Sequence, residues 1–377
     1  MPHRIIKKSL ALHKKHKGKT EICIKMPVMN RKHLSLIYTP GVGGVSQEIS
    51  RDKSLTHTYT SKGNTIAIIS DGSAVLGLGN IGPEAAIPVM EGKSVLFKKF
   101  ANIDAFPIVL GTQDVDEIIR IVKGISPTFS AINLEDISAP RCFEIEERLI
   151  NELDIPVMHD DQHGTAIVVL AALINALKVV KKKKESVRVV INGAGAAGIA
   201  ITKILSLYGF SSIALVDSRG VISRARNDLN QSKKDILPLV KPEGVTLQDA
   251  MKGADVFIGV SAPNIVTKET VRSMNKNAIV FAMANPVPEI MPGDAKEAGA
   301  RIVASGRSDF PNQINNALVF PGVFRGLLDY RIKKLTPEMK VKAAQAIASL
   351  VKKPTAGKII PNIFDKRIVP AIRNAMK

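Results

Sequence analysis

The stretch Gly193-Ala194-Gly195-Ala196-Ala197-Gly198 decides the fold. It follows the apolar run 186–191 and opens into the small, then apolar stretch Ile199–Tyr208. In a G-x-G-x-x-G turn between a strand and a helix, the glycines permit a tight turn, close approach of the backbone to a pyrophosphate, and close helix–strand packing. The helix N-terminus then presents free N–H groups to the phosphates. The stretch therefore predicts a dinucleotide site formed by Gly193, Gly195, Ala196, Ala197 and Gly198.

The acidic residue expected downstream of such a turn is Asp217. It ends the next apolar run, 212–216, at the carboxyl end of the second expected strand. There its carboxylate is expected to accept hydrogen bonds from the adenosine ribose, which favours NAD. Arg219 and Arg224 lie close enough in sequence to neutralise the 2′-phosphate of NADP. The sequence therefore leaves NAD and NADP open, with a slight preference for NAD.

A second glycine stretch, Gly77–Gly82, matches the same pattern in a different context. It also follows an apolar run, 65–70, and Pro83 suits the first position of a helix. However, the acidic Asp71 precedes the glycines, and Asp104 precedes the next apolar run instead of ending it. A ribose-binding acid belongs at the end of that strand. We interpret Gly77–Gly82 as backbone that closely approaches a ligand or another chain.

The alternation of strands and helices predicts an α/β protein in two parts. An N-terminal α/β catalytic domain is expected over 1–160, and a Rossmann-like, doubly wound NAD(P)-binding domain with C-terminal helices over 161–377. A long apolar helix, 165–181, crosses into the second domain. The expected strands are 65–70, 105–110, 129–133, 186–191, 212–216, 255–260, 278–284 and 301–305, and the expected helices include 115–122, 142–153 and 335–377, the last broken near 354–357.

The chain is basic, with 53 Lys and Arg residues against 34 Asp and Glu and a formal charge of +19 in 377 residues. Lysines gather in an expected helical arm, 1–33, and at Lys181–Lys184, and such runs occur in nucleic-acid-binding proteins. Because aromatic residues make up only 4% of the chain, we favour a solvated basic surface and no nucleic-acid partner. The chain has only two cysteines, which predicts a protein of the reducing cytoplasm. Its longest apolar run, 166–177, is too short to cross a bilayer, so we expect no membrane contact.

Carboxylates follow two expected strands. Glu135 and Asp136 end the run 129–134, and His159-Asp160-Asp161 ends the run 155–158. Acids at the carboxyl ends of neighbouring strands can converge on a hard cation, and oxygen ligands suit Mg²⁺ or Mn²⁺ better than zinc. The alternative is helix capping by Asp160 or Asp161. His159 and His163 are interpreted as structural histidines with satisfied hydrogen bonds.

Other polar residues carry little signal by themselves. Tyr38 lies in a turn-rich loop, where tyrosines usually pack, and Lys93 is one lysine among many. Asn285 ends the expected strand 278–284, where ligand contacts occur in doubly wound sheets. The amide-rich run Asn312–Asn316 indicates either a polar pocket or an exposed turn.

Taken together, these segments resemble the malic enzymes, in particular the short bacterial and archaeal type. The resemblance covers about residues 20–330, and the matching blocks follow the family's order. The blocks are Tyr38–Val42, Ser70–Pro83, Met90–Lys93, Ile132–Ile137, His159–Thr165, Gly193–Gly198, Ala284–Pro286 and Ser308–Asn316.

The resemblance implies a role for the scattered polar residues. The implied ligands of Mn²⁺ or Mg²⁺ are Glu135, Asp136 and Asp161. The implied general base is Lys93, and the implied general acid is Tyr38. The implied substrate contacts are Asn285, Asn315 and Asn316, of which Asn285 also contacts the cofactor. The implied reaction is the oxidative decarboxylation of L-malate to pyruvate and CO₂ with reduction of NAD(P)⁺, together with decarboxylation of oxaloacetate. A lysine acts as a base only when its pKa falls well below ~10.4, and burial beside a metal is expected to lower it.

One departure from the family concerns the substrate. Larger eukaryotic relatives carry an arginine that binds a substrate carboxylate where this chain has Ala74. We expect backbone amides of Gly77–Gly82 to replace it. The family also implies a homodimer or larger homo-oligomer, in which the N-terminal arm exchanges between subunits and carries Tyr38 to the partner's site.

Two alternatives belong to other functional classes. One is a non-decarboxylating NAD(P)-dependent 2-hydroxy-acid dehydrogenase, which shares the nucleotide domain but needs no carboxylate cluster. The other is a basic nucleic-acid-binding protein with a vestigial site.

Overall fold

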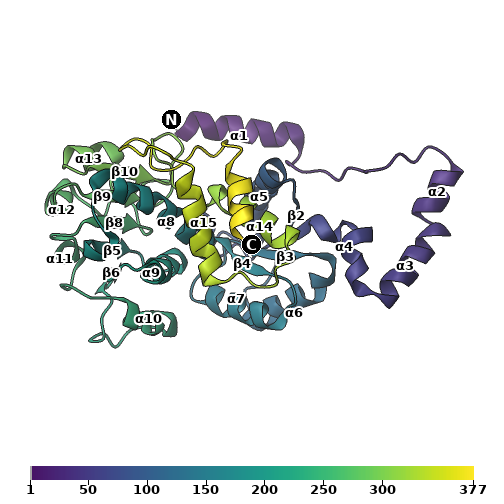
Figure 1. Ribbon diagram of the computed structural model, residues 1–377, viewed down its shortest axis with the longest axis horizontal. Coiled ribbons are helices and arrows are strands. Elements are labelled where there is room, and N and C mark those ends of the chain that lie inside the picture. The colour runs from purple at the N-terminus through teal and green to yellow at the C-terminus, as the bar shows by residue number, and fades with distance from the viewer. Residues whose placement is uncertain (1) are drawn as a thin grey trace.

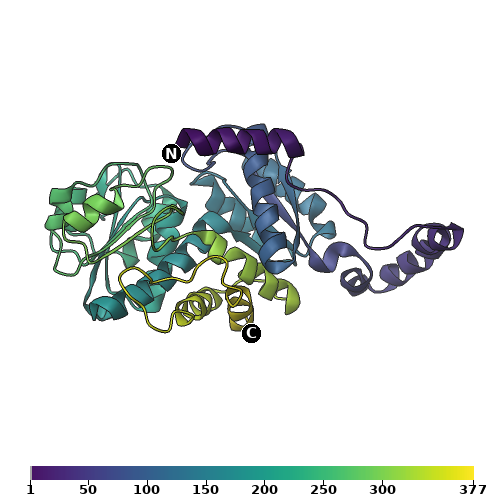
Figure 2. The same ribbon diagram turned by 90° about the horizontal axis from the view of Figure 1, so that it is seen from above.

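Two β-sheets lie side by side along the long axis of the molecule, and helices cover and connect them (Figure 1). The computed structural model describes residues 2–377, with side chains from Arg4 onward. An arm of short helices extends away from the body, and the view from above shows the same separation (Figure 2). The two sheets match the two expected parts of the chain.

The first sheet is parallel throughout, in the order β2-β1-β3-β4. Its strands are β1 (Thr65–Ser70), β2 (Asp104–Val109), β3 (Ala131–Leu134) and β4 (Val157–His159), and its helices are α5 (Pro83–Ala101), α6 (Val115–Ile125) and α7 (Arg141–Glu152). On β1, Ile66 and Ile68 face the core that includes α5, whereas Ala67 and Ile69 face α6 and α7. The central strand is therefore buried on both faces, as parallel sheets require.

The second sheet has the order β10-β9-β8-β5-β6-β7, in which only the edge strand β7 is antiparallel. Its elements are β5 (Arg188–Asn192), α9 (Ala196–Tyr208), β6 (Ser212–Asp217), β7 (Gly220–Val221), α10 (Gln231–Asp235), α11 (Leu247–Met251), β8 (Val256–Gly259), α12 (Lys268–Arg272), β9 (Ile279–Ala282), α13 (Pro292–Glu297) and β10 (Ile302–Ser305). The chain order reverses at β5, so the carboxyl ends of β5 and β8 border the crevice where doubly wound sheets bind ligands. The predicted Rossmann-like fold is confirmed.

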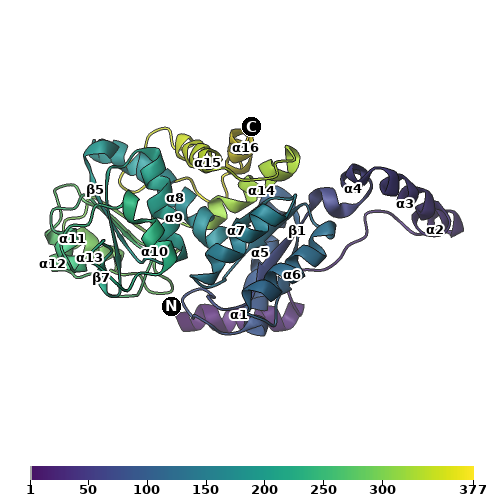
Figure 3. The ribbon, with the colours of Figure 1, turned by 90° about the horizontal axis from the view of Figure 1, so that it is seen from below.

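Helix α8 (Asp160–Val180) joins the two sheets and lies between them (Figure 3). It is long and apolar enough to cross a membrane, but most of it is buried within the protein. Its one interior polar residue, Asn175, is fully buried and donates to the carbonyl oxygens of Ala348 and Ile359 at 2.9 and 3.0 Å. Because this amide is satisfied by protein carbonyls, α8 is a core helix of the fold.

Three C-terminal helices complete the fold: α14 (Phe320–Asp329), α15 (Pro337–Ser349) and α16 (Ile368–Ala375). Helix α14 packs on α5 of the first sheet, α15 packs on α8, and α16 packs on both α14 and α15. Phe320 and Phe324 pack on Phe97 of α5, with ring centroids 4.6 and 5.3 Å apart. The expected break in this region is wider than predicted and extends over 350–367.

Two helix boundaries differ from the sequence prediction. Helix α8 begins at Asp160, not at residue 165, so both aspartates lie in its first turn, where the helix dipole favours negative charge. The basic segment 1–33 is not one helix. Helix α1 (Pro2–His16) ends where Lys17 and Gly18 adopt left-handed φ values of 53° and 114°.

The extended arm consists of α2 (Arg31–Ile37) and α3 (Gly41–Arg51), and α4 (Thr56–Tyr59) connects it to the first sheet. No residue of α2 or α3 is buried. Leu34, Leu36, Val42 and Val45 are among its exposed apolar side chains. Apolar surface turned away from the body is typical of a segment that packs on another chain.

Candidate active site

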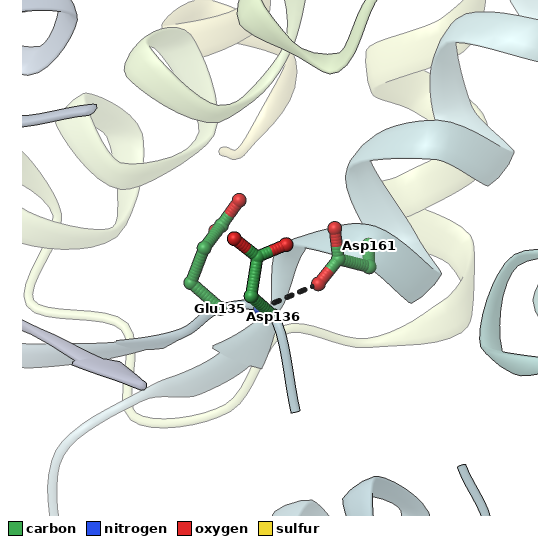
Figure 4. Close-up of side chains that lie close together, drawn as sticks. All are labelled: Glu135, Asp136 and Asp161. Carbon is green, nitrogen blue, oxygen red and sulfur yellow. Dashed lines mark hydrogen bonds between the residues drawn. The ribbon is translucent and has the colours of Figure 1, made fainter. Parts of the chain in front are cut away.

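Three carboxylates meet where the first sheet ends. Glu135 and Asp136 directly follow β3, and Asp161 lies in the first turn of α8, after the neighbouring strand β4. One oxygen of each lies within 4.8 Å of the others, and Figure 4 shows the three side chains turned toward one another. The backbone N–H of Asp136 donates to Asp161 Oδ2 at 2.8 Å, which fixes the two acids relative to each other. The parallel register of β3 and β4 therefore creates the cluster.

Burial and the neighbouring negative charges raise the pKa values of two carboxylates of the cluster, Glu135 and Asp136. Burial, followed by the charges of Asp161 and Glu135, raises the pKa of Asp136 to about 9. Asp136 also has a left-handed φ of 54°, and its buried Oδ2 has no hydrogen-bond partner among residues 4–377. A strained backbone and an unpartnered buried carboxylate oxygen fit a divalent cation with oxygen ligands.

Lys93 lies beside this cluster. It is buried on α5, and its Nζ donates to Glu135 Oε1 at 2.7 Å and to Asp160. The ammonium also lies over the ring of Phe320, 4.1 Å from the centroid. Burial acts to lower the pKa of Lys93, but the charges of Asp160, Glu135 and Asp161 outweigh it and hold the pKa above its usual value. The carboxylates thus stabilise the ammonium, and the lowering expected beside a bound metal stays a prediction.

Asp160 is a site residue that sequence reasoning interpreted only as a possible helix cap. It is fully buried and accepts a hydrogen bond from Lys93. A side chain at Gly164 would collide with it, because a Cβ there would lie 1.9 Å from Asp160 Oδ1. In the sequence, the pair Asp160-Asp161 followed one helical turn later by Gly164 could have indicated that Asp160 is packed inside the site.

A cleft of about 820 Å³ connects the cluster with the second sheet. It includes all three predicted substrate contacts, one residue of the predicted glycine turn and also, unexpectedly, three residues from the N-terminal segment. The predicted residues that line it are Lys93, Glu135, Asp136, Asp161, Ala197, Asn285, Asn315 and Asn316, and the unexpected ones are Ser9, His13 and Lys19. The carboxyl ends of both sheets thus face one shared space.

The glycine turn has the geometry of a cofactor cradle. A Cβ on Gly198 would lie 1.7 Å from the carbonyl oxygen of Gly193, so α9 can begin this close to β5 only with glycine at 198. Gly193 has φ 118°, and Gly195 is the N-cap of α9. The free N–H groups of the first turn, at Ala196 and Ala197, are available to a pyrophosphate.

Asp217 ends β6 as expected, and its carboxylate is paired with cations other than Arg219 and Arg224, the residues expected to neutralise a 2′-phosphate. Its carboxylate accepts hydrogen bonds from Arg226 at 2.7 and 3.1 Å and from Lys233 at 2.6 Å. Arg219 pairs instead with Asp228 at 2.9 Å. Arg226 and Lys233 are therefore the cations beside the expected ribose position.

The loop Gly77–Gly82 makes the expected close backbone approach at Gly77, but to another loop of the same chain and not to a ligand or another chain. A Cβ on Gly77 would lie 1.9 Å from the carbonyl oxygen of Asn285, so the backbones of the two loops are in direct contact. Pro83 occupies the first turn of α5. This contact holds the Asn285 loop against the first sheet.

Tyr38 is not near the cluster of its own chain. It lies at the end of α2 on the extended arm and is 66% exposed, and it is absent from the described lining of the cleft. The structure thus separates Tyr38 from the other predicted catalytic residues.

The two histidines have different environments. His163 lies 3.0 Å from Glu146 and 3.0 Å from Lys340, in a second hollow of about 930 Å³ between α7, α9 and α15. Glu146 also accepts from the backbone N–H of His159 at 2.7 Å. The ring nitrogens of His159 are buried without a hydrogen-bond partner among the described residues. The prediction of satisfied histidines therefore holds for His163 and is wrong for His159, because the nearest carboxylate oxygen to its Nε2, Asp161 Oδ2, lies 3.8 Å away, beyond hydrogen-bond distance.

Comparison with known proteins identifies the family. The N-terminal domain of malic enzymes matches residues 17–150, and the NAD-binding domain of malic enzymes matches residues 162–372. The chain belongs to the malic enzyme family. Malic enzymes are oxidoreductases that act on the CH–OH group of malate, so this malic enzyme uses NAD(P)⁺ and, as is typical of the family, a divalent metal.

Individual relatives are similar in sequence to this protein over nearly the whole chain. A bifunctional malic/malolactic enzyme of Bacillus subtilis (strain 168) is 55% identical over 98% of this chain and 91% of its own length. An NAD-dependent malic enzyme of Geobacillus stearothermophilus is 55% identical over 95% of this chain and 76% of its own length. The crystal structure of an NAD-dependent malic enzyme from Thermotoga maritima superposes with a TM-score of 0.94 at 48% identity, covering 98% of each chain. Relatives described as NADP-dependent also match, at 44% to 47% identity, so the family alone leaves the cofactor open.

A first prediction concerns the metal ligands. Asp136→Asn should abolish the rise in melting temperature that Mn²⁺ produces in the wild type, because a central ligand is lost. Without metal, the variant should melt no lower than the wild type, since one of three repelling carboxylates is gone. Thermal unfolding with and without Mn²⁺ measures both effects. Asp154→Asn, at an exposed acid, is the control, and an undiminished Mn²⁺ shift in Asp136→Asn would contradict the assignment.

A second prediction concerns cofactor choice. Asp217→Ala frees Arg226 and Lys233 to bind a 2′-phosphate, so the ratio of kcat/KM for NADP⁺ to that for NAD⁺ should rise about tenfold or more. Steady-state kinetics with both cofactors measures the ratio. Asp228→Ala, which removes another partner of Arg226 but leaves Asp217 in place, should change it far less. An unchanged ratio in Asp217→Ala would show that these cations do not face the ribose.

Proposed function

We propose that the cleft converts L-malate to pyruvate and CO₂, with Lys93 as the general base. One observation carries this proposal: the buried Nζ of Lys93 lies 2.7 Å from Glu135, inside the carboxylate cluster. A base in this position can reach a hydroxyl held at the cluster. The neighbouring amides Asn285, Asn315 and Asn316 offer donors from the opposite wall of the cleft.

Each group of the chain has a distinct task in this reaction. A divalent ion held by Glu135, Asp136 and Asp161 would polarise the C2 oxygen of malate and stabilise negative charge that develops on it. When the carboxylates are neutralised, the attraction that keeps the proton on Lys93 weakens, and burial then favours the neutral amine. Lys93 takes the proton of the C2 hydroxyl as hydride leaves C2, while Asp160 holds the amine in position. Phe320 covers the amine and excludes water from it.

Tyr38 is proposed as the general acid of a partner subunit's site. Its own arm carries it away from the body, so protonation of C3 in the same chain would require the arm to fold back. The arm's exposed apolar side chains support packing on a second copy of the chain, as in a two-fold symmetric dimer. In such an exchange each site receives Tyr38 from the other subunit.

Two further assignments are proposals. We place the domain boundary at residues 160–161, supported by the end of β4 and the start of α8; the C-terminal helices nevertheless pack back on α5. We also place the protein in the cytoplasm. Cys23 and Cys142 are unpaired, which suits a reducing compartment.

The proposed chemistry is tested by product analysis. Wild-type protein with L-malate, Mn²⁺ and NAD⁺ or NADP⁺ should form reduced cofactor, pyruvate and CO₂ in equal amounts, and EDTA should stop the reaction. Lys93→Ala should lower the rate about a hundredfold or more with cofactor affinity retained, whereas Lys98→Ala, at an exposed lysine on the same helix, should be active. Reduction without CO₂ would indicate a simple dehydrogenase, and full activity of Lys93→Ala would refute its role as base. Lactate is measured in parallel, because the Bacillus subtilis relative is also named malolactic.

Exchange of Tyr38 is tested by complementation. Tyr38→Phe and Asp136→Ala should each be nearly inactive as homodimers. In a mixed dimer, the Tyr38→Phe subunit retains its metal site and receives an intact Tyr38 from its partner. Co-expression in equal amounts should therefore restore about a quarter of wild-type activity, since half of the dimers are mixed and each has one complete site. Recovery of no activity in a mixed dimer verified by differential tags would show that Tyr38 serves its own chain.

A further inference from the structure

The N-terminal segment contributes an unpaired cation to the cleft. Lys19 is half-buried and lines the same cavity as Lys93 and the carboxylate cluster. Its Nζ donates to the carbonyl oxygen of Pro88 at 2.5 Å, and no carboxylate of residues 4–377 lies within 4.0 Å of it. A single neutral carbonyl leaves the charge uncompensated and two N–H donors free.

Local sequence holds Lys19 in this position. Lys17 and Gly18 have left-handed φ values, so the chain turns sharply after α1. Gly18 then lies against α5, where a Cβ would be 3.0 Å from Glu91 Oε1. The ammonium lies next to Gly92, where a Cβ would be in ordinary contact with Lys19 Nζ at 3.6 Å. The ammonium therefore lies on the turn of α5 that immediately precedes Lys93.

The substrate requires a cation of this kind. Malate carries a carboxylate at each end, and only the end beside the C2 hydroxyl can share the cluster of Glu135, Asp136 and Asp161. The 4-carboxylate must be bound elsewhere in the cleft, and an ionised carboxylate leaves water at low cost only when it is paired. Lys93 is already committed to Glu135 and Asp160. On the loop side, Ala74, Leu76 and Gly77 line the cleft without a charge, and Gly77 is the one residue of the expected amide loop Gly77–Gly82 in the described lining.

We propose that Lys19 binds the 4-carboxylate of malate and so determines that the enzyme accepts a dicarboxylate. This inference rests on the proposed function, because it assumes malate at the carboxylate cluster. The ion pair exists in the bound substrate and is lost as that carboxylate leaves as neutral CO₂. It therefore strengthens substrate binding without favouring the transition state of decarboxylation.

Kinetics of Lys19→Met separate this role from a structural one. KM for L-malate should rise about 10- to 100-fold while kcat changes by less than about threefold, because the lost interaction belongs to the bound substrate. KM for the cofactor and inhibition by oxalate should stay within about twofold, since oxalate fits the cluster but has no 4-carboxylate. Lys19→Arg should restore most of the affinity for malate. Lys17→Met, which removes the same charge from the same exposed turn, is the matched control and should behave as the wild type.

The outcomes distinguish the two proposals. An unchanged KM for malate in Lys19→Met, with an active wild type, overturns the role of Lys19 and leaves the proposed function intact. If Lys19→Met loses affinity for malate and oxalate alike, the role of Lys19 is also overturned, because such a loss shows a general distortion of the cleft. A wild-type protein that does not oxidise malate refutes the proposed function itself.

Discussion

The mutual repulsion of buried carboxylates beside Lys93 is the constraint on which the site depends. Glu135 and Asp136 are buried and lie close to the partly exposed Asp161, and such an arrangement is unfavourable without a cation. Lys93 offsets part of this charge through Glu135 and Asp160. A divalent ion held by the three carboxylates would offset the rest. The arrangement thus couples the charge state of Lys93 to that of the cluster.

Helix α8 links this chemistry to the rest of the molecule. Its first turn carries Asp160 and Asp161, and its far half is fixed to the C-terminal segment through the buried amide of Asn175. Its apolar residues belong to a core that both sheets share. The carboxylate cluster at the end of the first sheet is therefore connected to the second sheet through α8. Phe320 strengthens this connection, because a residue from near the C-terminus covers the amine of Lys93 on α5.

The N-terminal segments contribute to the cleft from outside these two sheets. Helix α1 and Lys19 form one wall of it, whereas α2 and α3 carry Tyr38 away on an arm with no buried residue. Both segments are basic or apolar where they are exposed, and much of the chain's net positive charge lies here. Helix α1 and Lys19 thus complete the cleft of their own chain. The arm of α2 and α3 has the exposed apolar surface of a segment that packs on another chain.

The sequence by itself determined the Rossmann-like turn, the alternation of strands and helices, and the carboxylates that end β3 and β4, because these depend on local glycine geometry, on periodicity and on motif order. Only the tertiary structure decided which charges meet. Arg226 and Lys233, not Arg219, neutralise Asp217; Asp160 binds Lys93; Lys19 reaches the cleft, and Tyr38 does not. The physical reason is that electrostatic energies depend on distances between side chains that are remote in sequence and on their burial. The local pattern of residues predicts neither these distances nor the burial.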